Sequence, residues 1–581
     1  MTDTTPVLTS SYARGASSPR LLDKTIGQQL ADTASRFPAR DALVSRHQGV
    51  RWTYAELQQR SLQLASALLN AGLAKGDRVG IWSHNNAEWV LLQMATAQVG
   101  IILVNINPAY RTSELEYALN KVQCKALFAM ERFKTSDYLG MVRELAPELA
   151  GAAPGQLAAA QLPDLRWVVW IDGAASGVPG QGAEQPGMQR FSQFIAGGDA
   201  ADARIAPIAA TLTPHDPVNI QFTSGTTGFP KGATLTHRNI LNNGFFIGEA
   251  MKLTEQDRLC IPVPLYHCFG MVLGNLACMT HGAAMVYPSD GFDPLLVLET
   301  VQAERCTGLH GVPTMFIAEL DHPRFAEFDL STLRTGIMAG SPCPIEVMKR
   351  VVSEMNLSEI TIAYGMTETS PVSCQSSTDT PLSKRVSTVG MVQPHLEVKI
   401  VSPETGETVA PGTSGELCTR GYSVMHGYWG QDADTVAKTR EAIDAEGWMH
   451  TGDLATMDAE GYVNIVGRIK DMVIRGGENI YPREIEEFLY THPQVQDVQV
   501  VGVPDKRFGE ELCAWIVVKA GQALDEDAVR EFCQGRIAHY KVPRYIRFVD
   551  AFPMTVTGKI QKFKIREAMI ESLQLEIDRT A

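Results

Sequence analysis

The chain of 581 residues lacks the features that mark membrane, secreted and nucleic-acid-binding proteins. No apolar run comes near the ~18 residues that a membrane-spanning helix needs, and the first residues contain no apolar signal-peptide core. Lys and Arg number 51 against 65 Asp and Glu, which leaves a net charge of −14 and no global positive field. Such a balance disfavours binding to nucleic acid or to anionic membranes. We therefore expect a cytoplasmic protein with no transmembrane segment and no nucleic-acid partner.

The ten cysteines show none of the spacings that are typical of zinc sites or redox pairs. The sequence contains no C-x-x-C and no Cys/His cluster. Reduced and buried thiols are the simplest interpretation, because cytosolic proteins seldom carry disulfides. Positive charge gathers only locally: residues 536–566 hold eight basic residues and one acidic residue. A basic surface of that size suits a small anionic ligand.

What is present indicates more than one domain, because the chain is too long for a single core. The predicted fold class is α/β: a large N-terminal layered α/β domain with parallel sheets and a small β-rich subdomain, plus a small mobile α+β C-terminal domain. The expected parts are a flexible N-terminal tail at 1–25, an N-terminal domain at 26–469 and a C-terminal lid domain at 470–581. Residues 151–200 are rich in Ala, Gly, Pro and Gln, which favours an insertion or exposed linker there.

Several helix ends are readable from single residues. Thr53 and Glu56 have the spacing of a capping box, and Gly72 suits the position after the last helical residue. Pro482 suits the first turn of another helix. Asp525 is placed to cap a third helix with the sequence DEDAVREFCQGRIAHY.

The stretch TSGTTGFPKG, residues 223–232, does not have the composition of a packed helix or strand. Its small residues let backbone N–H groups approach phosphate oxygens, the hydroxyls of Ser224, Thr226 and Thr227 add donors, and Lys231 adds a charge. The kinase-type loop requires G-x-x-x-x-G-K-[ST], and here Pro230 precedes the Lys and a Gly follows it. The stretch therefore predicts a phosphate loop of another kind, with a mobile surface loop as the alternative.

Together with other motifs in order along the chain, this loop resembles the signature of the adenylate-forming (AMP-binding) superfamily. PLYHCFG (264–270) resembles its aromatic motif and GIMAGSPCP (336–344) its adenine-contacting stretch. The remaining motifs are YGMTE (364–368), TGD (451–453), GRIKDMVIRGGENIYPREIE (467–486) and TVTGKIQK (555–562). The run of motifs is most similar to acyl-CoA synthetases, in particular bacterial fatty acyl-CoA and medium-chain acyl-CoA ligases. The resemblance implies an enzyme with ATP, Mg²⁺ and CoA as cofactor and co-substrates.

The resemblance also implies roles for individual residues. Lys559 would offset negative charge as the carboxylate meets the α-phosphorus, Thr367 would donate to the phosphate, and His267 would lie at the mouth of the acyl site, although a lone His is often a plain core residue. Glu368 and Thr227 are the expected Mg²⁺ ligands. The expected ATP and AMP contacts are Thr223, Ser224, Gly225, Thr226, Thr227, Gly228, Lys231, Gly340, Ser341, Pro342, Tyr364, Gly365, Met366, Asp453 and Arg468.

Three further expectations concern the second half of the reaction. Lys470 matches the hinge position between the two domains, and Gly476, Gly477 and Glu478 match the loop that lines the CoA site. The basic stretch 536–566 could meet the CoA phosphates, an inference from its charge alone.

The acid itself is less well specified. The stretches HCFGMVLGNLACM (267–279) and GVPTMFIAEL (311–320) are apolar, which favours a medium- or long-chain fatty acid. The same stretches could be ordinary core, so an aryl acid stays open, as does transfer to a carrier-protein thiol in place of CoA. The oligomeric state also stays open, with a homodimer as one option.

Overall fold

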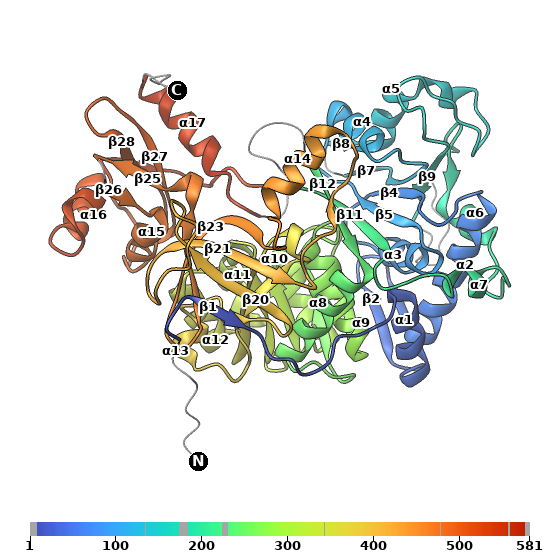
Figure 1. Cartoon of the computed structure of the whole chain (residues 1–581), viewed down its shortest axis with the longest axis horizontal. Coiled ribbons are helices and arrows are strands. Elements are labelled where there is room, and N and C mark those ends of the chain that lie inside the picture. Colours follow the sequence, from blue (N-terminus) through green and yellow to red (C-terminus); the bar gives the residue numbers. More distant parts are fainter. Residues whose placement is uncertain are drawn as a thin grey trace, which may run out of the picture.

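The structure is a computed structural model that describes residues 8–133, 135–173, 184–223, 230–341, 343–476, 478–555 and 558–575. Its described part contains two large mixed sheets, an antiparallel five-stranded sheet and a separate C-terminal five-stranded sheet. Figure 1 shows the C-terminal unit, in orange and red, standing over one end of the molecule. The predicted α/β class, with a β-rich part and a small C-terminal part, is confirmed. Among the described residues, no helix is both long and apolar enough to cross a membrane.

The first large sheet has eight strands, in the order β10-β9-β6-β4-β5-β11-β12-β22. The pairs from β10 to β11 are parallel, whereas β12 runs antiparallel to both of its neighbours. The strands are β4 (Arg78–Trp82), β5 (Ile102–Asn105), β6 (Ala126–Met130), β9 (Trp167–Ile171), β10 (Gln189–Arg190), β11 (Pro217–Thr223), β12 (Lys231–Thr236) and β22 (Gly427–Tyr428). The predicted buried strand at 78–82 is β4.

The second large sheet has nine strands, in the order β19-β18-β17-β16-β15-β13-β14-β2-β3. Its inner pairs are parallel and its two ends antiparallel. The strands are β2 (Asp41–Ser45), β3 (Val50–Thr53), β13 (Arg258–Cys260), β14 (Ala284–Tyr287), β15 (Gly308–Gly311), β16 (Thr335–Ala339), β17 (Glu359–Gly365), β18 (Val372–Gln375) and β19 (Met391–Val392).

Helices cover these sheets and pack between them. α3 lies inside one core with α1, α2, η3, α8 and α9, and every one of its residues is buried. The bounds in this group are α1 (Ile26–Arg36), α2 (Tyr54–Asn70), α3 (Ala87–Val99), α8 (His237–Ala250), η3 (Phe269–Leu276) and α9 (Ala277–His281). The other helices of the large domain include α4 (Thr112–Lys121), α5 (Tyr138–Leu145), α6 (Phe191–Ala196), α7 (Ile205–Ala209), α10 (Pro294–Glu304), α11 (Pro313–Leu320), α12 (Ile345–Glu354), α13 (Leu382–Arg385) and α14 (Ala433–Ala442).

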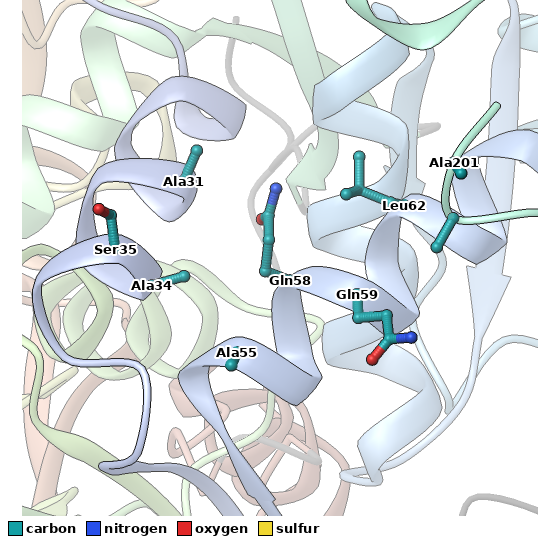
Figure 2. Close-up of a pocket in the computed structure, with 9 residues that line it drawn as sticks. Ala31, Ala34, Ser35, Ala55, Gln58, Gln59, Leu62 and Ala201 are labelled. Atoms are coloured by element: carbon teal, nitrogen blue, oxygen red, sulfur yellow. The ribbon is translucent and has the colours of Figure 1, made fainter. Parts of the chain in front are cut away.

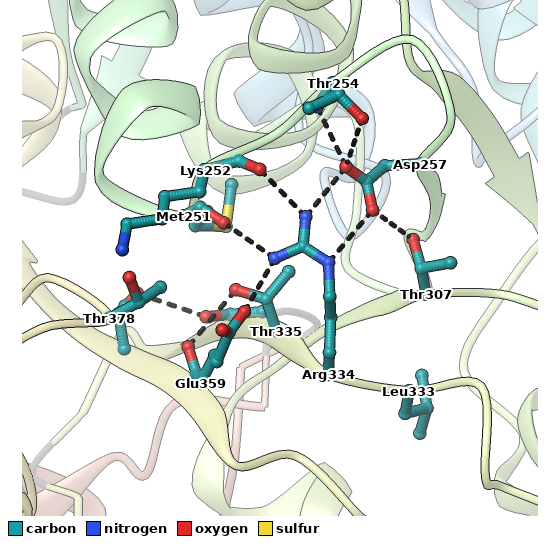
Figure 3. Close-up of polar contacts among 12 residues, drawn as sticks. Met251, Lys252, Thr254, Asp257, Thr307, Leu333, Arg334, Thr335, Glu359 and Thr378 are labelled. Carbon is teal, nitrogen blue, oxygen red and sulfur yellow. Dashed lines mark hydrogen bonds and ion pairs between the residues drawn. The ribbon is translucent and has the colours of Figure 1, made fainter.

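An ion-pair network ties the strand starts of the nine-stranded sheet together (Figure 3). Arg334, just before β16, donates to Asp257 through Nη2 at 2.7 Å and to Glu359 through Nη1 at 2.7 Å. Its remaining N–H groups reach the carbonyl oxygens of Met251 and Lys252. Burial alone would raise the pKa of Asp257, but the hydrogen bonds from Arg334 and its neighbours outweigh it and lower the pKa. A buried charge is tolerated here because its hydrogen bonds are satisfied.

The antiparallel sheet has the order β1-β20-β21-β23-β24. Its strands are β1 (Tyr12–Arg14), β20 (Leu396–Val401), β21 (Gly415–Gly421), β23 (Met449–Met457) and β24 (Val463–Arg468). The C-terminal sheet contains β25 (Val473–Arg475), β26 (Glu478–Ile480), β27 (Val495–Asp505), β28 (Gly509–Val518) and β29 (Tyr545–Phe548), covered by α15 (Pro482–Tyr490), α16 (Glu526–Cys533) and α17 (Lys562–Ser572).

The expectation of a flexible tail at 1–25 is wrong for residues 8–25. Tyr12–Arg14 pairs with β20, so β1, in blue, forms the edge of the antiparallel sheet (Figure 1). Ser11 is buried, and its hydroxyl donates to the Ala410 carbonyl at 3.0 Å. This short segment is ordered because the exposed edge of β20 supplies backbone partners that its own polar composition does not reveal. Residues 1–7 lie outside the described part of the chain.

The interpretation of 151–200 as an insertion or exposed linker is also wrong in part. Trp167–Ile171 is strand β9, which lies between β6 and β10 and is largely buried. The apolar run WVVWI is enough for a core strand, but the Ala/Gly/Pro-rich stretches on both sides mask it in a compositional average. Residues 174–183 lie outside the described part.

The helix ends follow the residues that predict them. The capping box of Thr53 and Glu56 opens α2, and Pro482 is in the first turn of α15. Asp525 accepts from the Ala528 N–H at the start of α16. That helix is shorter than predicted and ends at Cys533, because Gly535 takes a positive φ of 72° that ends a helix readily.

Candidate active site

The predicted phosphate loop joins two antiparallel strands of the eight-stranded sheet. Thr223 at the end of β11 is paired with Lys231 at the start of β12. The residues between them that were predicted to contact ATP, namely Ser224, Gly225, Thr226, Thr227 and Gly228, lie outside the described part of the chain. The Lys231 ammonium lies 4.9 Å from the ring centroid of Tyr428, which comes from the neighbouring strand β22. The pairing of the two strand ends therefore brings the Thr223 hydroxyl and the Lys231 ammonium to the same edge of the loop.

Glu368 connects this loop to the YGMTE motif. It lies in the single turn η5 (Thr367–Thr369) after β17, and it is buried. One carboxylate oxygen, Oε1, accepts from the Tyr428 hydroxyl at 3.0 Å and from the Thr223 hydroxyl at 3.2 Å. Residues from two separate strands, β11 and β22, thus orient one buried carboxylate. Both donors are neutral hydroxyls, and a carboxylate oxygen is a ligand that Mg²⁺ prefers.

Thr367, the neighbour of Glu368, faces Cys268 of the PLYHCFG motif. The Cys268 thiol donates to Gln221 Oε1 at 3.1 Å. Burial chiefly raises the pKa of Cys268 to about 12, and the hydrogen bonds with Gln221 and Thr367 oppose that rise only partly. Because a thiol is nucleophilic only as thiolate, Cys268 is a packing residue at neutral pH and not a nucleophile.

Asp453 forms a second buried acidic centre. It accepts from the Tyr364 hydroxyl at 2.7 Å and from Arg468 Nε at 2.9 Å. Arg468 is its partner in the β23–β24 ladder, so the hairpin itself presents the two charges together. The Asp453 charge chiefly raises the pKa of Arg468. Burial, followed by the charge of Asp453, holds the pKa of Tyr364 well above its usual value.

Lys559 reaches this place from the C-terminal domain. Thr555 and Lys559 bond to each other across a tight turn, in which the Thr555 N–H donates to the Lys559 carbonyl at 2.7 Å. Gly558 takes a φ of 78° and approaches the large domain closely: a Cβ there would lie 3.0 Å from Val312 Cγ2. A Cβ at Gly340 would lie 3.1 Å from Cγ1 of the same Val312. The turn that carries Lys559 therefore sits beside the predicted adenine-contacting stretch.

The Lys559 ammonium interacts electrostatically with charged residues of both acidic centres. Its side chain keeps an exposed surface, yet many protein atoms lie around it. This partial desolvation chiefly lowers the pKa of Lys559, the Arg468 charge lowers it further, and Asp453, Asp471 and Glu368 oppose both effects. Lys559 and Arg468 thus both supply positive charge near the two acidic centres, where phosphate charge would be neutralised.

His267 faces the same ammonium. Burial, and then the charge of Lys559, lower the pKa of His267 to about 4, so its imidazole is neutral at pH 7. The Phe269 N–H donates to His267 Nδ1 at 3.2 Å, which fixes the direction of the ring. A neutral, oriented imidazole can direct a substrate without adding charge.

Some predicted residues lie away from this centre. Gly476 donates its N–H to the Phe508 carbonyl, and the β25–β26 hairpin that carries Gly476 and Glu478 pairs with β28 inside the C-terminal sheet. Lys470 is exposed in the turn η6 (Ile469–Asp471) between β24 and β25. Pro342 and Gly477 lie outside the described part. Gly365 is the last residue of β17 and Met366 follows it, and the Met366 N–H donates to the Pro371 carbonyl at 3.0 Å. Ser341 lies partly exposed after β16.

Sequence reasoning missed Tyr428, which orients Glu368 and covers Lys231. A signal exists: Tyr428 and Trp429 are adjacent aromatics between Gly427 and Gly430, and both glycines take φ above 130°. Such a pattern indicates a tight approach of backbone to a site. Asp471 was also missed, because its contribution comes only from the placement of η6.

Two other cavities are outside this centre. A shallow groove of about 480 Å³ lies between α1, α2 and the turn at Ala200–Ala201, where Gln58 projects between the two helices (Figure 2). Its wall is mostly alanine and carries no charged group, so it offers little to hold a polar ligand. A second cavity, of about 290 Å³, lies between β24 and α15 at the junction of the two domains.

Comparison with known families gives matches over both parts of the chain. The model described as "AMP-binding enzyme" matches residues 30–429, and the model described as "AMP-binding enzyme C-terminal domain" matches residues 484–559. The first match ends at Trp429, beside Tyr428, and the second ends at Lys559.

Individual proteins match over nearly their entire length. The "Putative acyl-CoA synthetase YngI" of Bacillus subtilis (strain 168) is 51% identical over 556 residues, which cover 96% of this chain and 99% of that protein. The human protein named "Medium-chain acyl-CoA ligase ACSF2, mitochondrial" is 46% identical over 577 residues, 98% of this chain and 92% of that protein.

Among solved structures, an anthranilate CoA ligase, AuaEII, in complex with anthranoyl-AMP superposes with a TM-score of 0.83 at 26% identity, covering 96% of this chain and 100% of that one. ATP-bound MatB from Rhodopseudomonas palustris superposes with a TM-score of 0.78 at 27% identity, covering 94% and 99%.

Proposed function

The chain belongs to the AMP-binding enzyme family, and from that premise we propose that it activates a medium- or long-chain fatty acid with ATP and transfers the acyl group to CoA. It is an AMP-forming acyl-CoA synthetase, as the names of relatives 46–51% identical over nearly the whole chain support. In the reaction the carboxylate displaces pyrophosphate from ATP and forms an acyl adenylate, and a thiol then displaces AMP. We propose CoA as the acceptor thiol, a fatty acid as the substrate, and the residue roles given below.

The observation that carries the proposal is the close approach of the Lys559 turn to Val312, beside Gly340, together with the electrostatic interaction of Lys559 with Asp453 and Glu368. As the carboxylate oxygen approaches the α-phosphorus, negative charge accumulates on the phosphate oxygens. An ammonium that is already in position offsets this charge without reorganisation. Lys559 is proposed to fulfil that role in the first half-reaction, and Thr367 to donate a hydrogen bond to the α-phosphate. Pyrophosphate would leave toward Lys231 and the loop that follows Thr223.

Asp453 and Arg468 are proposed to hold the ribose. A buried carboxylate can accept from both ribose hydroxyls, as acidic residues do in dinucleotide-binding folds. In the structure Asp453 already accepts from Tyr364 and Arg468, which hold its two oxygens in a fixed direction. The ring of Tyr364 is proposed to face the adenine.

The residues around Glu368 fit Mg²⁺. The donor set offers a buried carboxylate oxygen and the hydroxyl of Thr223, both hard oxygen ligands, at the mouth of the predicted phosphate loop. Glu368, with Thr227 from that loop, would hold the ion. When bound, the ion would neutralise charge on the ATP phosphates.

The second half-reaction is proposed to use other residues of the C-terminal domain. Rotation about Lys470 would withdraw Lys559 and bring Gly476, Gly477 and Glu478 toward the acyl adenylate. The exposed Arg536, together with the rest of the stretch 536–566, would then be available for CoA phosphates.

A fatty acid is favoured over an aryl acid by the buried apolar stretch that follows His267. Met271, Val272 and Leu273 lie in the π-helical segment η3, and all three are buried beside the site. A π-helical segment is often found at a functional site, where it widens the helix. The name of the human relative agrees with this choice, whereas the anthranilate ligase keeps an aryl acid as the second candidate. Transfer to a carrier-protein thiol is the third.

A reducing location in the cytoplasm is also proposed. All ten cysteines lie in the described part of the chain, and all are free and buried. That pattern is typical of proteins in reducing compartments. Cell fractionation with an antibody against the protein tests this part separately, and a secreted fraction would contradict it.

An acid panel tests the function. Pyrophosphate release is measured with acetate, octanoate, palmitate and benzoate, each with and without CoA, and products are identified by mass spectrometry. We expect octanoate or palmitate to give the highest kcat/KM, with an acyl-CoA product and CoA-stimulated turnover. Turnover that does not respond to CoA would favour the carrier protein, and a preference for benzoate would overturn the fatty acid.

A further inference from the structure

Three potential metal-binding side chains meet on the antiparallel sheet, and none of them is among the proposed ATP contacts. Glu416 and Cys418 lie two residues apart on β21, so they project from one face of the sheet. His450 on β23 is the direct partner of Cys418 in the ladder. One ligand atom from each residue lies within 4.8 Å of the other two. The strand register, and not sequence spacing, brings them together, so no motif in the sequence reveals them.

The distances suit a tetrahedral ion. His450 Nδ1 lies 2.9 Å from Glu416 Oε2 and 3.5 Å from Cys418 Sγ. With a metal–sulfur distance of about 2.3 Å and metal–nitrogen or metal–oxygen distances of about 2.0–2.2 Å, ligand atoms at tetrahedral corners lie roughly 3.3–3.6 Å apart. The two observed distances are close to these separations. A shift of a few tenths of an ångström in Glu416 would lengthen the shorter distance to the tetrahedral value.

The outer contacts also match those of a metal site. The second ring nitrogen of His450, Nε2, faces Asp444 Oδ2 at 3.7 Å. A carboxylate behind a ligating imidazole fixes the tautomer that leaves the other nitrogen free to bind metal. Asp444 is itself held, because its Oδ1 accepts from the N–H groups of Glu446 and Trp448. Glu416 is held as well, since its Oε1 accepts from the Gly452 N–H at 3.0 Å.

The cluster has an entry path and a favourable charge. Cys418 is buried, but the side chains of Glu416 and His450 keep 15% and 36% of their surface exposed, so an ion can reach the thiol from solvent. Glu416, Asp444 and a metal-bound thiolate supply three negative charges. One cation, Lys399, is near Cys418, and its ammonium is directed over the Trp448 ring at 4.4 Å.

We propose that Glu416, Cys418 and His450 form a binding site for Zn²⁺ or a similar borderline divalent ion, with a fourth position open to water. A thiolate and an imidazole select such ions over the hard Mg²⁺ that accompanies ATP. Binding releases the thiol proton, and also the Nδ1 proton where the imidazole carries it, to solvent while the metal bonds to sulfur and nitrogen form.

The proposed metal site lies next to the strand segment that carries Asp453, the carboxylate proposed to bind the ribose. Opposite Cys418 and Glu416, β23 has a bulge between His450 and Leu454, and this bulge contains Gly452 and Asp453. Bulges next to active sites serve to redirect a side chain. A metal held by Glu416 and His450 therefore fixes both sides of the bulge that presents Asp453.

Cobalt is the probe for this site, because Co²⁺ bound to a thiolate absorbs in the near ultraviolet and Zn²⁺ displaces it. The reduced, metal-free full-length chain is titrated with CoCl₂. We expect one Co²⁺ per chain with a sulfur-to-cobalt band, and displacement by ZnCl₂. Cys418→Ser and His450→Gln should each weaken binding by at least about tenfold and remove the band or shift it, and Asp444→Asn should weaken binding by about 10–100-fold.

The matched control is Cys533→Ser, a buried cysteine of α16 in the other domain, which should leave the band unchanged. Because Cys418→Ser could misfold, circular dichroism accompanies each titration, and the half-exposed His450→Gln gives an independent reading. The absence of a thiolate band in the wild type would overturn the proposal. So would an unaltered band in folded Cys418→Ser or His450→Gln.

Discussion

At the scale of single residues, the proposed site depends on partners that come from distant positions in the chain. Glu368 takes its two hydrogen bonds from Thr223 and Tyr428, and Asp453 takes its own from Tyr364 and Arg468. Each carboxylate is buried and oriented before a substrate arrives. Preorganised groups of this kind stabilise a transition state without reordering.

Asp453→Asn tests the proposed ribose contact. The amide keeps the size of the side chain but loses the charge that pairs with Arg468 and accepts from ribose. Hydrogen bonds to charged groups contribute about 1.5–3 kcal/mol, so we expect the KM for ATP to rise roughly 10–100-fold. Steady-state kinetics at saturating acid give the value, with exposed Asp550→Asn as the control. An unchanged KM for ATP would exclude Asp453 from the nucleotide site.

Buried histidines should make the stability fall as the pH is lowered. Burial lowers the pKa of His310 to about 4, and its two ring nitrogens bond to Leu273 O and to the Ile337 N–H. The unfolded chain binds this proton near the ordinary pKa of 6.5, so it holds more protons than the folded chain between about pH 6.5 and pH 4. Stability contributed by the neutral ring is present above pH 6.5 and is lost as the pH falls through that window, up to roughly 3 kcal/mol for one residue.

His310→Gln keeps a donor and an acceptor but cannot titrate. We expect its Tm to fall less than that of the wild type between about pH 7 and about pH 5, in a thermal-denaturation series. His215→Gln changes an exposed residue and should follow the wild type. Parallel curves for His310→Gln and the wild type would contradict the account.

At the scale of elements, local signals predicted the ends of helices better than the place of strands. The capping box at Thr53 and the Pro at 482 act within one turn, so they are readable from the sequence. β1 and β9 were missed because their stability comes from neighbouring strands far away in the chain. Pairing of that kind depends on tertiary context and not on the segment itself.

Lys470→Pro tests the proposed hinge between β24 and β25. Proline fixes φ near −65° and restricts the residue before it, so it limits rotation of the C-terminal domain. We expect acid-dependent ATP–pyrophosphate exchange to stay within about threefold of the wild type. Thioester formation from supplied acyl adenylate should fall by at least about tenfold.

Lys470→Asp, which changes the charge without stiffening the backbone, is the control and should keep both half-reactions. Equal losses of exchange and thioester formation in Lys470→Pro would count against domain rotation at this position.

At the scale of the whole molecule, the site is formed where four parts of the chain converge. They span more than 300 residues of the chain: the β11–β12 hairpin, the end of β17, the β23–β24 hairpin and the turn before α17. The resemblance of the motifs to a known family predicted from the sequence that most of these residues serve one function. It did not supply their geometry, and it missed Tyr428, whose role depends on the pairing of β12 with β22.

The α/β class of the fold could be predicted from the sequence, but the order of the strands in each sheet could not. Alternating patterns indicate layered α/β structure, but they do not say which strands become neighbours across 100 residues or more. The order β5-β11 and the pairing of β14 with β2 are examples. Long-range pairing of this kind gives the chain its shared core around α3.

The central claim is that the C-terminal domain brings Lys559 to the nucleotide site for adenylate formation. The direct measurement is acid-dependent ATP–pyrophosphate exchange in Lys559→Ala, paired with thioester formation from supplied acyl adenylate. The account predicts that exchange falls by about 10²–10³-fold while thioester formation stays within about threefold of the wild type. Lys519→Ala, at an exposed lysine of the same domain outside the stretch 536–566, should change neither. Exchange at the wild-type rate in Lys559→Ala would contradict the account.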